Sequence, residues 1–585
     1  NCKKSNVIRK IIVFLRHKII SRLLDDMKNL LISLLLCILA MGAQAQRQPR
    51  LEHRDNSTAR IVVNDRPMLM IGGELGNSSA STPEDVKRTF SHLHKMGLNT
   101  VLVPVSWELI EPQEGEFDMG TLDVILSEAR HNELKVVLLW FGAWKNSMSC
   151  YAPEWFKRDV KRFPRAHTSE GVPVEEASSL SKNVLEADKR AFCHVMAYLR
   201  DHDALEQTVI MVQVENEIGM IEVPRDYSAD ATRMYQSAVP KQLTDYLKRY
   251  QKSLHPYLKE KLQPQAKAGA NWAQLFGDDI YTEEIFQTWT YATYVEQIAK
   301  AGREIYNLPM YVNVALNSRD RKPGQYPSGG PLAHLIDLWH CGAPSIDVLG
   351  VDIYDKGIKS WLAKYHLPNN PLFVPEIRLE DKDAMYALYA FGHHGAMGFC
   401  PFSIEDYPLT TTSNANDWKQ MDLSQDDQLN AFSSVGSSLS PLVASYQLLR
   451  QTEPLILERQ GTKDMDAVLL DNEQREAEIV TADGIRLTVK HSYSLGWEPG
   501  AKGAEWPETA CIILRLGKED YLVIGSGVVV TFQQRIGLAK CEEVEIVDGK
   551  QRIIRHLNGD QTHQGRHVRI PVGAFQIQHF KLYRY

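Results

Sequence analysis

Eight short apolar runs, each long enough for one buried strand, recur along the chain with helix-length segments between them. Several are apolar at consecutive positions, as in KVVLLWF, which is typical of parallel strands buried on both faces. The runs span residues 68–75, 99–107, 135–141, 208–216, 310–316, 346–354, 371–377 and 395–402. Amphipathic helices are predicted between them, for example over 119–131, 184–200, 284–306 and 380–393. Eight such repeats predict an α/β fold, a closed (β/α)8 TIM barrel.

An open, doubly wound sheet is the alternative arrangement of the same repeat. It would favour a glycine-rich phosphate turn after the first strand, and the residues at 72–76, GGELG, do not fit GxGxxG. The first helix has clear local signals, because residues 81–83 supply hydroxyl caps and a first-turn proline. Gly97 supplies its stop. The local signals therefore favour strand–helix repeats without a nucleotide site.

The pattern changes near Glu453, where strand-like runs and hairpin turn signals replace the helices. We predict a catalytic (β/α)8 barrel over residues 46–452, with a helical stretch near 426–450, and an all-β, sandwich-like accessory domain over 453–585. The second domain has no obvious catalytic constellation, so we expect it to support the barrel or to bind substrate. Within the barrel, residues 218–283 form an unusually long connection that we expect to wall the active site.

The first 45 residues differ from the rest in charge and resemble an export signal. From Met27, one lysine is followed by an apolar stretch and a small-x-small site, which predicts a signal peptide over Met27–Ala45 and a periplasmic or secreted protein. We expect residues 1–26 to lie upstream of the natural start, and a membrane anchor is the alternative. Residues 1–45 carry eight Lys or Arg against two Asp, so a formal charge of −7 leaves −13 on the remainder. That acidity argues against nucleic acid as a partner.

Motifs for other chemistries are missing from the sequence. The six cysteines after residue 45 are scattered without a CxxC, which indicates neither a disulfide framework nor a zinc site. HExxH, a P-loop and GxSxG are absent, and the neighbouring His393 and His394 make a poor metal pair. We therefore expect no metal ligands.

Acidic residues stand at the carboxyl ends of six of the eight predicted strands, where the chemistry of such a barrel gathers. They are Glu74, Glu108, Glu215, Glu217, Asp352, Glu376, Glu405 and Asp406. The sharpest pattern is VQVENEIG at 212–219, in which strand alternation places Glu215 and Glu217 on one side with Asn216 between them. Polar residues at the end of an apolar strand are costly unless they face a polar site. A strand-end hydrogen-bond network without catalysis is the alternative.

A second carboxylate, Glu376, ends the seventh run in the sequence PLFVPEIR. By itself it is more typical of a structural ion pair with Arg378. The fourth and seventh strands lie roughly across a barrel from one another, so we expect Glu217 and Glu376 to face each other. Two carboxyl groups about 5–5.5 Å apart are what retaining glycoside cleavage requires, one as nucleophile and one as acid. Different surroundings would hold their pKa values apart.

Two motifs resemble signatures of glycoside hydrolase family 35 β-galactosidases. NTVLVPVSWELIEPQEGEFDM at 99–119 is similar to their second-strand signature, and VQVENEIG at 212–219 to their fourth-strand signature. The barrel also resembles the related family 42, over about residues 55–435. The resemblance implies that Glu217 is the acid/base and Glu376 the nucleophile of a retaining β-glycosidase that needs no cofactor. The strand-rich tail resembles an accessory domain of such barrels.

The sequence departs from family 35 at positions that contact the sugar in that family. Pro104 stands where a tyrosine is usual, and residues 140–146, WFGAWKN, stand where Cys-Ala-Glu-Trp is usual. Candidate substrate-binding residues are polar or flat aromatic side chains near strand ends or in the long connection: Asn216, Glu74, Trp107, Trp144, Asn146, Tyr354 and Trp289. Core packing is the alternative for each aromatic residue, and Tyr354 could also hydrogen-bond the nucleophile.

The sequence thus predicts a retaining exo-β-glycosidase, with β-galactosidase as the first hypothesis and terminal β-galactosides of oligosaccharides as substrates. Another β-glycoside (glucoside, glucosaminide or arabinoside) cleaved by the same mechanism is one alternative, and a non-catalytic glycan-binding barrel is another. We expect an oligosaccharide substrate as the partner, no nucleic acid and no membrane after signal cleavage. The oligomeric state is left open.

Overall fold

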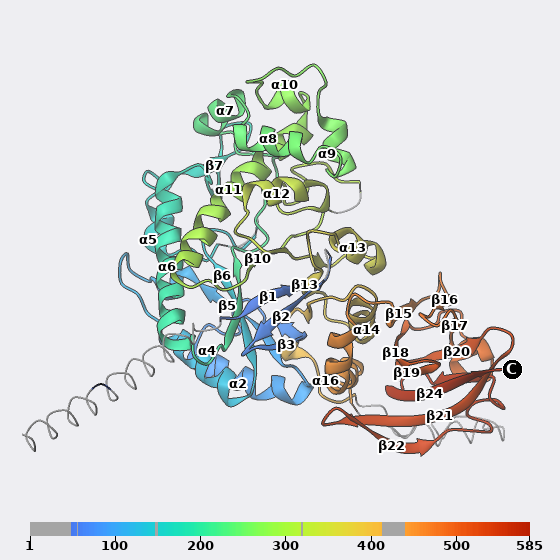
Figure 1. Ribbon diagram of the computed structural model, residues 1–585. Coiled ribbons are helices and arrows are strands. Elements are labelled where there is room, and N and C mark those ends of the chain that lie inside the picture. Colours follow the sequence, from blue (N-terminus) through green and yellow to red (C-terminus); the bar gives the residue numbers. More distant parts are fainter. Residues whose placement is uncertain (1–27, 29–47, 55–56, 147–149, 318–319, 412–438) are drawn as a thin grey trace, which may run out of the picture. The chain divides into compact units, whose positions relative to one another are not determined.

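The computed structural model describes residue 28 and residues 48–54, 57–146, 150–317, 320–411 and 439–585 (Figure 1). The chain divides into two compact units, residues 1–48 and 49–585, and the fold below belongs to the second. The predicted signal peptide Met27–Ala45 lies outside the described residues, apart from Lys28, so its cleavage and the export of the protein stay predictions.

A parallel sheet of nine strand segments forms the barrel, in the order β11-β10-β9-β6-β5-β4-β14-β13-β12 (Figure 1). These strands are β4 (Met70–Glu74), β5 (Thr100–Ser106), β6 (Lys135–Phe141), β9 (Val209–Val214), β10 (Met310–Val312), β11 (Val348–Leu349), β12 (Asp352–Ile353), β13 (Phe373–Ile377) and β14 (Gly398–Pro401). The outer members, β11 and β12, are consecutive pieces of one strand that is interrupted at Gly350 and Val351, so the sheet closes on itself. The TIM-barrel prediction is confirmed, and each predicted run contains its strand.

The helices alternate with these strands as predicted. α2 (Pro83–Leu93) begins at the expected place, since the Thr82 hydroxyl accepts from the Asp85 backbone N–H and Pro83 is the first helical residue. Gly97 has a φ of 89° and ends the turn that follows α2. The other barrel helices include α4 (Gly120–His131), α6 (Lys182–Asp203), α11 (Ile280–Ile305), α12 (Ile336–Gly342), α13 (Ile358–Tyr365) and α14 (Asp383–His393).

The inside of the barrel is packed with apolar side chains. Leu102, Leu139, Tyr311 and Phe373 belong to one buried cluster there. A small antiparallel sheet before β4 adds the side chains of Ala59, Ile61 and Val63 to the same cluster. Its strands are β1 (Arg50–His53), β2 (Ala59–Val63) and β3 (Arg66–Met68). Because the interior is filled, polar chemistry is confined to the strand ends.

The long connection at 218–283 folds into four short helices. They are α7 (Ala229–Gln236), α8 (Lys241–Arg249), α9 (Pro256–Lys261) and α10 (Trp272–Phe276). α8 contacts α12, and α10 contacts α11. The connection therefore packs on the helical layer of the barrel, and its role as a wall of the active site stays a prediction.

Antiparallel sheets follow the barrel, as predicted. The six-stranded sheet has the order β15-β18-β19-β24-β21-β22 and the four-stranded sheet the order β16-β17-β20-β23. The strands are β15 (Met465–Leu470), β16 (Glu476–Val480), β17 (Arg486–His491), β18 (Thr509–Gly517), β19 (Asp520–Ser526), β20 (Val528–Phe532), β21 (Ile536–Val547), β22 (Lys550–His556), β23 (His567–Ile570) and β24 (Gln576–Arg584). A second buried cluster, which includes Leu487, Val530 and Phe580, joins the two sheets.

The change to strands comes later than the sequence indicates. α16 (Pro441–Arg459) runs across Glu453 and through Pro454, and the first strand begins only at Met465. A proline usually ends a helix, but Ile456 and Leu457 beyond it are buried and keep the last turns in place. Residues 426–438 of the predicted helical stretch lie outside the described residues.

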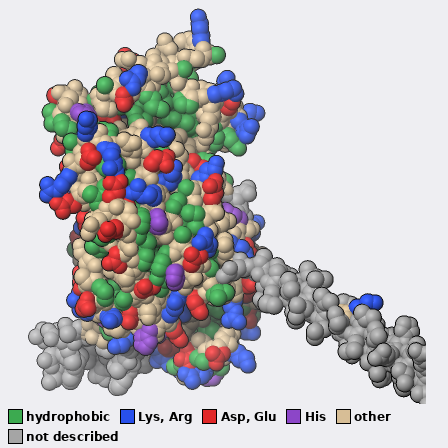
Figure 2. Space-filling view, turned by 90° about the vertical axis from the view of Figure 1, so that its left-hand side faces the viewer, with side chains coloured by type: hydrophobic (Ala, Val, Ile, Leu, Met, Phe, Trp, Pro, Cys, Tyr) green, Lys and Arg blue, Asp and Glu red, His purple; other side chains and the backbone are tan. Residues whose placement is uncertain are grey.

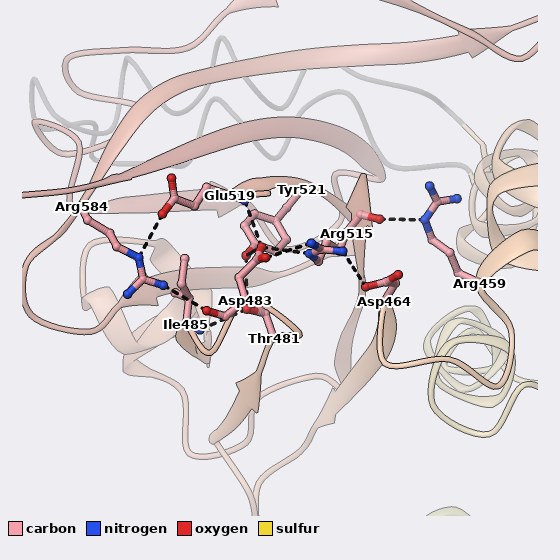
Figure 3. A network of polar contacts seen from close by, with 9 residues as sticks. All are labelled: Arg459, Asp464, Thr481, Asp483, Ile485, Arg515, Glu519, Tyr521 and Arg584. Carbon is pink, nitrogen blue, oxygen red and sulfur yellow. Dashed lines mark hydrogen bonds and ion pairs between the residues drawn. The ribbon is translucent and has the colours of Figure 1, made fainter. Parts of the chain in front are cut away.

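Charged side chains in the C-terminal sheets are mutually paired (Figure 3). Arg515 of β18 donates through two nitrogens to Asp483 at 2.9 Å each and through a third to Asp464 at 3.0 Å. Tyr521 also donates to Asp483. The hydrogen bonds from Arg515 are the main reason why the pKa of the Asp483 carboxyl lies well below its usual value. Arg459 of α16 donates to the Arg515 carbonyl at 2.7 Å and so ties the helix to the sheet.

The described surface carries charges of both signs. On the face in Figure 2, Lys and Arg side chains are interspersed with Asp and Glu. A cavity of about 620 Å³ lies beside the network of Figure 3, with His393, Asp466 and Arg515 among its lining residues. Within the described residues, none of the helices combines the length and the apolar character that crossing a membrane requires.

Candidate active site

Three carboxyl groups converge at the carboxyl ends of the barrel strands. Asp352 on β12 and Glu376 on β13 are direct neighbours in the register of two parallel strands. Glu217 follows β9, and oxygens of all three side chains lie within 4.8 Å of one another. Asp352 and Glu376 are buried, and Glu217 is 9% exposed. The predicted convergence of Glu217 and Glu376 is therefore present, with Asp352 between them as a third acid.

The backbone after β9 leaves the extended conformation, which changes where the two glutamates of VQVENEIG point. Glu215 has a φ of 60° and Glu217 a φ of 44°, both in the left-handed region that is uncommon for residues other than glycine. The Glu215 carboxyl accepts from the Trp144 backbone N–H at 2.8 Å and is hydrogen-bonded to Asp188 of α6. Glu215 is thus absent from the carboxyl cluster of Glu217. The prediction that both lie on one side is wrong, because alternation ends at Val214.

Amide side chains fix Glu217 in place. Its backbone N–H donates to Asn313 Oδ1 at 2.9 Å, and Asn313 Nδ2 donates to Asp352 Oδ2 at 2.8 Å. The carboxyl of Glu217 is hydrogen-bonded to both Asn146 and Asp352. Asn216 lies just behind, and its Nδ2 donates to the Lys145 carbonyl at 2.9 Å. Of the predicted binding residues, Asn146 contacts the acid/base candidate directly, and Asn216 supports the chain around it.

One carboxyl oxygen of Glu376 accepts a hydrogen bond from a tyrosine hydroxyl, and the other has no partner among the described residues. The Tyr354 hydroxyl donates to Glu376 Oε1. Glu376 Oε2 is buried and has no hydrogen-bond partner among the described residues. Tyr354 is 38% exposed although its hydroxyl is deep in the site, so part of its ring faces solvent. The hydrogen bond expected between Tyr354 and the predicted nucleophile, Glu376, is present.

Glu74 lies fully buried at the end of β4, and neither of its carboxyl oxygens has a partner in the described part of the chain. The Tyr311 hydroxyl, inside the barrel, is also unpaired and is influenced by the charge of Glu74. Buried polar atoms without partners are rare in folded proteins, and a functional role is a common reason for them. Two buried carboxyl oxygens without described partners are compatible with the predicted role of Glu74 in substrate binding, which stays a prediction.

Electrostatics push all four acids toward their protonated forms. Burial, followed by the nearby charge of Glu217, raises the pKa of Glu376 to about 7. Burial raises the pKa of Glu217, while Lys145 and its hydrogen bonds oppose that shift. The pKa values of Glu74 and Asp352 lie well above their usual values, first through burial and then through Glu376. The charge of Lys145 lowers the pKa of each of these four carboxyl groups, but burial outweighs it.

The predicted tryptophans do not meet the carboxyl cluster. Trp107 donates from Nε1 to Glu111 at 2.8 Å and packs against Trp155 and Phe156. Trp289 is buried on α11 beside Gly342 of α12. Both residues follow the alternative, core packing, because their rings are buried between elements.

The described contacts of Trp144 and Glu108 are also with residues outside the carboxyl cluster. The Trp144 ring packs edge-on against Tyr294 and Tyr291 of α11, with centroids 4.7 and 5.7 Å away. Glu108 forms an ion pair with Lys157 at 3.3 Å, and its side chain is 38% exposed.

Several site residues had no assigned role in the sequence. Asp352 was one of eight strand-end acids, and only the register with Glu376 distinguishes it from the others. Lys145 is buried next to Asn146 and its charge acts on Glu74, Glu217 and Glu376. Asn313 lies just after β10, in an apolar run without a motif. An amide directly after a buried strand is the signal that could have found Asn313, and a charged residue in or shortly after a buried strand is the signal for Asp352 and Lys145.

The same three carboxyl groups have the donor set for a cation. Glu217, Asp352 and Glu376 form the one group with suitable spacing among the described residues. Hard cations such as Ca²⁺ and Mg²⁺ prefer carboxylate oxygens. The predicted absence of metal ligands stays a prediction.

Residues 78–283 match the family model of glycoside hydrolase family 42, described as β-galactosidase. This segment is a family 42 domain. The predicted family resemblance is thereby confirmed for family 42, and the chain carries a glycoside hydrolase domain. Residues 442–569 match a family described as a domain of unknown function (DUF5597). The matched segments cover the first half of the barrel after β4, with Glu217 but without Glu376, and most of the C-terminal sheets.

Similar proteins include a β-galactosidase of Xanthomonas manihotis, which is 32% identical over 157 residues. That match covers 24% of this chain and 23% of the relative, so the chain spans about a quarter of the length of its curated relative. A β-galactosidase from the haloarchaeon Halorubrum lacusprofundi is 17% identical, with a TM-score of 0.40 over 57% of this chain and 52% of that one. One from Marinomonas ef1 is 13% identical, with a TM-score of 0.42 over 67% and 61%.

Proposed function

We propose that this protein is a retaining exo-β-galactosidase that removes terminal β-galactosides from oligosaccharides. The observation that carries the proposal is the meeting of Glu217 and Glu376, with oxygens within 4.8 Å of one another. Retaining glycosidases need about 5–5.5 Å between their carboxyl groups, whereas inverting ones need roughly 6.5–9.5 Å to admit a water. The short separation favours double displacement. A non-catalytic barrel predicts carboxyl groups well apart, and this spacing disfavours it.

In the proposed first step, an ionised Glu376 oxygen attacks the anomeric carbon while the bond to the leaving oxygen breaks. Glu217, protonated at the start, gives its proton to that oxygen. In the second step, Glu217 takes a proton from water as the water oxygen attacks the same carbon. The bond to Glu376 breaks as the new bond forms, and both acids return to their starting states.

The surrounding residues suit these roles. Tyr354 donates to one oxygen of Glu376, which leaves the unpaired Oε2 free to attack. Asn313 and Asn146 hold Glu217, so little reorganisation is needed during proton transfer. Glu74 has two unpaired oxygens that would accept from sugar hydroxyl groups.

Galactose is proposed as the sugar from the names of the matched family and of its relatives. A panel of aryl β-glycosides, with galactoside, glucoside, glucosaminide and arabinoside, tests this directly. We expect the galactoside to have the highest kcat/KM, with galactose released as the β-anomer. Higher kcat/KM on another glycoside would move the assignment to that sugar, and release of the α-anomer would contradict the retaining mechanism.

Two variants test the residues. Glu376→Gln should lower kcat/KM by at least about 10³-fold, because the amide cannot act as the nucleophile. Glu108→Gln is the matched control, since Glu108 also stands at a strand end but pairs with Lys157 outside the cluster. Equal activity of the two variants would refute the assignment of Glu376.

Export of the protein is proposed on the sequence of residues 27–45 alone. Expression in a Gram-negative host followed by N-terminal sequencing of the periplasmic fraction should give a chain that starts after Ala45. A chain that stays in the cytoplasm with Met27 intact would contradict it.

A further inference from the structure

Glu215, the first glutamate of VQVENEIG, is buried against a second carboxyl group. It is 1% exposed, and Asp188 of α6 is fully buried. A hydrogen bond joins the two side chains. After burial, the strongest influences on Glu215 are Asp188 and the backbone N–H groups of Trp144 and Ala143. Two carboxyl groups in such contact must share a hydrogen, and it has to reside on one of them.

The donors around the pair show which carboxyl carries that hydrogen. Asp188 already accepts from Trp140 Nε1 at 2.9 Å on one oxygen, and from the Tyr294 hydroxyl at 2.8 Å and the Ala143 N–H at 3.3 Å on the other. Both of its oxygens therefore act as acceptors, as in an ionised group. Glu215 Oε2 accepts from the Trp144 N–H, while Oε1 has no donor in the described part of the chain. The hydrogen belongs on Glu215 Oε1, where it is donated to Asp188. Burial and the charge of Asp188 also raise the pKa of Glu215.

The pair holds a turn that reaches the active site. Ala143 and Trp144 donate to the two carboxyl groups, and the same turn continues into Lys145 and Asn146. Asn146 is hydrogen-bonded to the Glu217 carboxyl, and the charge of Lys145 acts on Glu217 and Glu376. The turn is fixed from its other side by Asn216, which bonds the carbonyls of Trp144 and Lys145.

We infer that Glu215, as a neutral hydrogen-bond donor, and Asp188, as its ionised acceptor, form a positioning pair that sets residues 143–146 against the acid/base Glu217. The inference rests on the proposed function, because Glu217 must act as an acid for its position to matter. Glu215 and Asp188 touch neither substrate nor reacting atoms in this account. Misplacement of a catalytic group by about 1 Å can cost roughly 100-fold in rate.

The assignment of the hydrogen predicts opposite outcomes for two similar substitutions. In Glu215→Gln, the amide oxygen can still accept from Trp144 and the amide NH2 can still donate to Asp188, so kcat/KM should stay within about threefold of wild type. In Asp188→Asn, the new NH2 must face donors from Trp140 or from Tyr294 and Ala143. We expect kcat/KM for phenyl β-galactoside to fall about 100-fold.

The leaving group separates a positioning role from general damage to the fold. Phenyl β-galactoside needs protonation by Glu217, whereas 2,4-dinitrophenyl β-galactoside leaves without it. The loss in Asp188→Asn should therefore be at least about tenfold larger on the phenyl substrate, with KM changed little. Tyr294→Phe, which removes one donor to Asp188 with little change in shape, should give the same preference at smaller amplitude. Tyr294→Phe therefore still tests the inference if Asp188→Asn does not fold.

Three results would overturn the inference. The first is a Glu215→Gln variant as inactive as Glu217→Gln. The second is an Asp188→Asn variant as active as the Glu108→Gln control. The third is an equal loss of kcat/KM on the phenyl and the 2,4-dinitrophenyl substrates in each folded variant. A wild-type protein inactive on both galactosides would refute the proposed substrate instead. In that case urea unfolding still tests which carboxyl carries the hydrogen, since Asp188→Asn should be clearly less stable than Glu215→Gln.

Discussion

Carboxyl groups in the barrel and in the C-terminal sheets meet opposite surroundings. At the barrel end, Glu74, Asp352 and Glu376 are buried, each has at least one oxygen without a described partner, and their pKa values are raised. In the C-terminal sheets, Asp483 accepts from Arg515 and Tyr521, and its pKa is lowered (Figure 3). The paired carboxyl group in the C-terminal sheets stabilises the fold. Buried carboxyl groups without partners, as at the barrel end, cost stability and are retained where a ligand or a reaction uses them.

The largest expected effect comes from removing the proposed acid, Glu217, at the barrel end. Glu217→Gln should lower kcat/KM for phenyl β-galactoside by about 10²–10⁴-fold, because proton transfer to the leaving oxygen is lost. On 2,4-dinitrophenyl β-galactoside the loss in kcat/KM should be far smaller. Comparable losses on both substrates would contradict the acid role.

A smaller effect is expected from the phenol that serves Glu376. Tyr354→Phe removes a donor to the ionised nucleophile, so the pKa of Glu376, about 7 in the wild type, should rise. The acid limb of the pH profile of kcat/KM should shift to higher pH, with about a 10- to 100-fold loss near pH 6. An unchanged acid limb would separate Tyr354 from the nucleophile.

The unpaired acids should also make stability depend on pH. The folded protein keeps protons on Glu376 and Glu74 that the unfolded chain releases above about pH 4.5, so stability falls between about pH 4.5 and at least pH 7. Glu74→Gln removes the cost of keeping this carboxyl protonated in the folded protein, and should raise the unfolding free energy by about 1–2 kcal/mol at pH 8 and much less at pH 4.5. Urea unfolding at both pH values measures this. An equal gain at both would contradict it.

The smallest effect is expected in the paired network. Arg515→Gln should lower the unfolding free energy by less than about 1 kcal/mol, since the Arg515 side chain is 25% exposed and solvent screens its pairs. Activity at saturating substrate should be unchanged. A large loss of activity in this variant would show that the two regions are coupled.

Much of this fold could be predicted from the sequence, because buried parallel strands leave continuous apolar runs. All eight runs contain their strands, and the Thr82 cap begins its helix as expected. The end of α16 was missed, since Pro454 lies inside the helix and packing of later residues holds it there. Local signals decide where elements begin, and burial can override them where they end.

The site was predictable in part for a related reason. Glu217 and Glu376 lie at strand ends, where the closed barrel brings distant residues together. Glu215 was misplaced because two left-handed residues after Val214 break the alternation on which the prediction depended. Trp107 and Trp289 were named for their flat surfaces, but a sequence does not distinguish a ring that packs between helices from one that faces a ligand.

Covalent trapping tests the central claim most directly. A 2-deoxy-2-fluoro-β-galactosyl fluoride should form a stable glycosyl-enzyme, because the fluorine slows its hydrolysis more than the leaving group slows its formation. Digestion and mass spectrometry should then place one sugar on the peptide that contains Glu376. A label on Glu217, Asp352 or Glu74 would contradict the account, as would turnover of galactosides without any trapped intermediate.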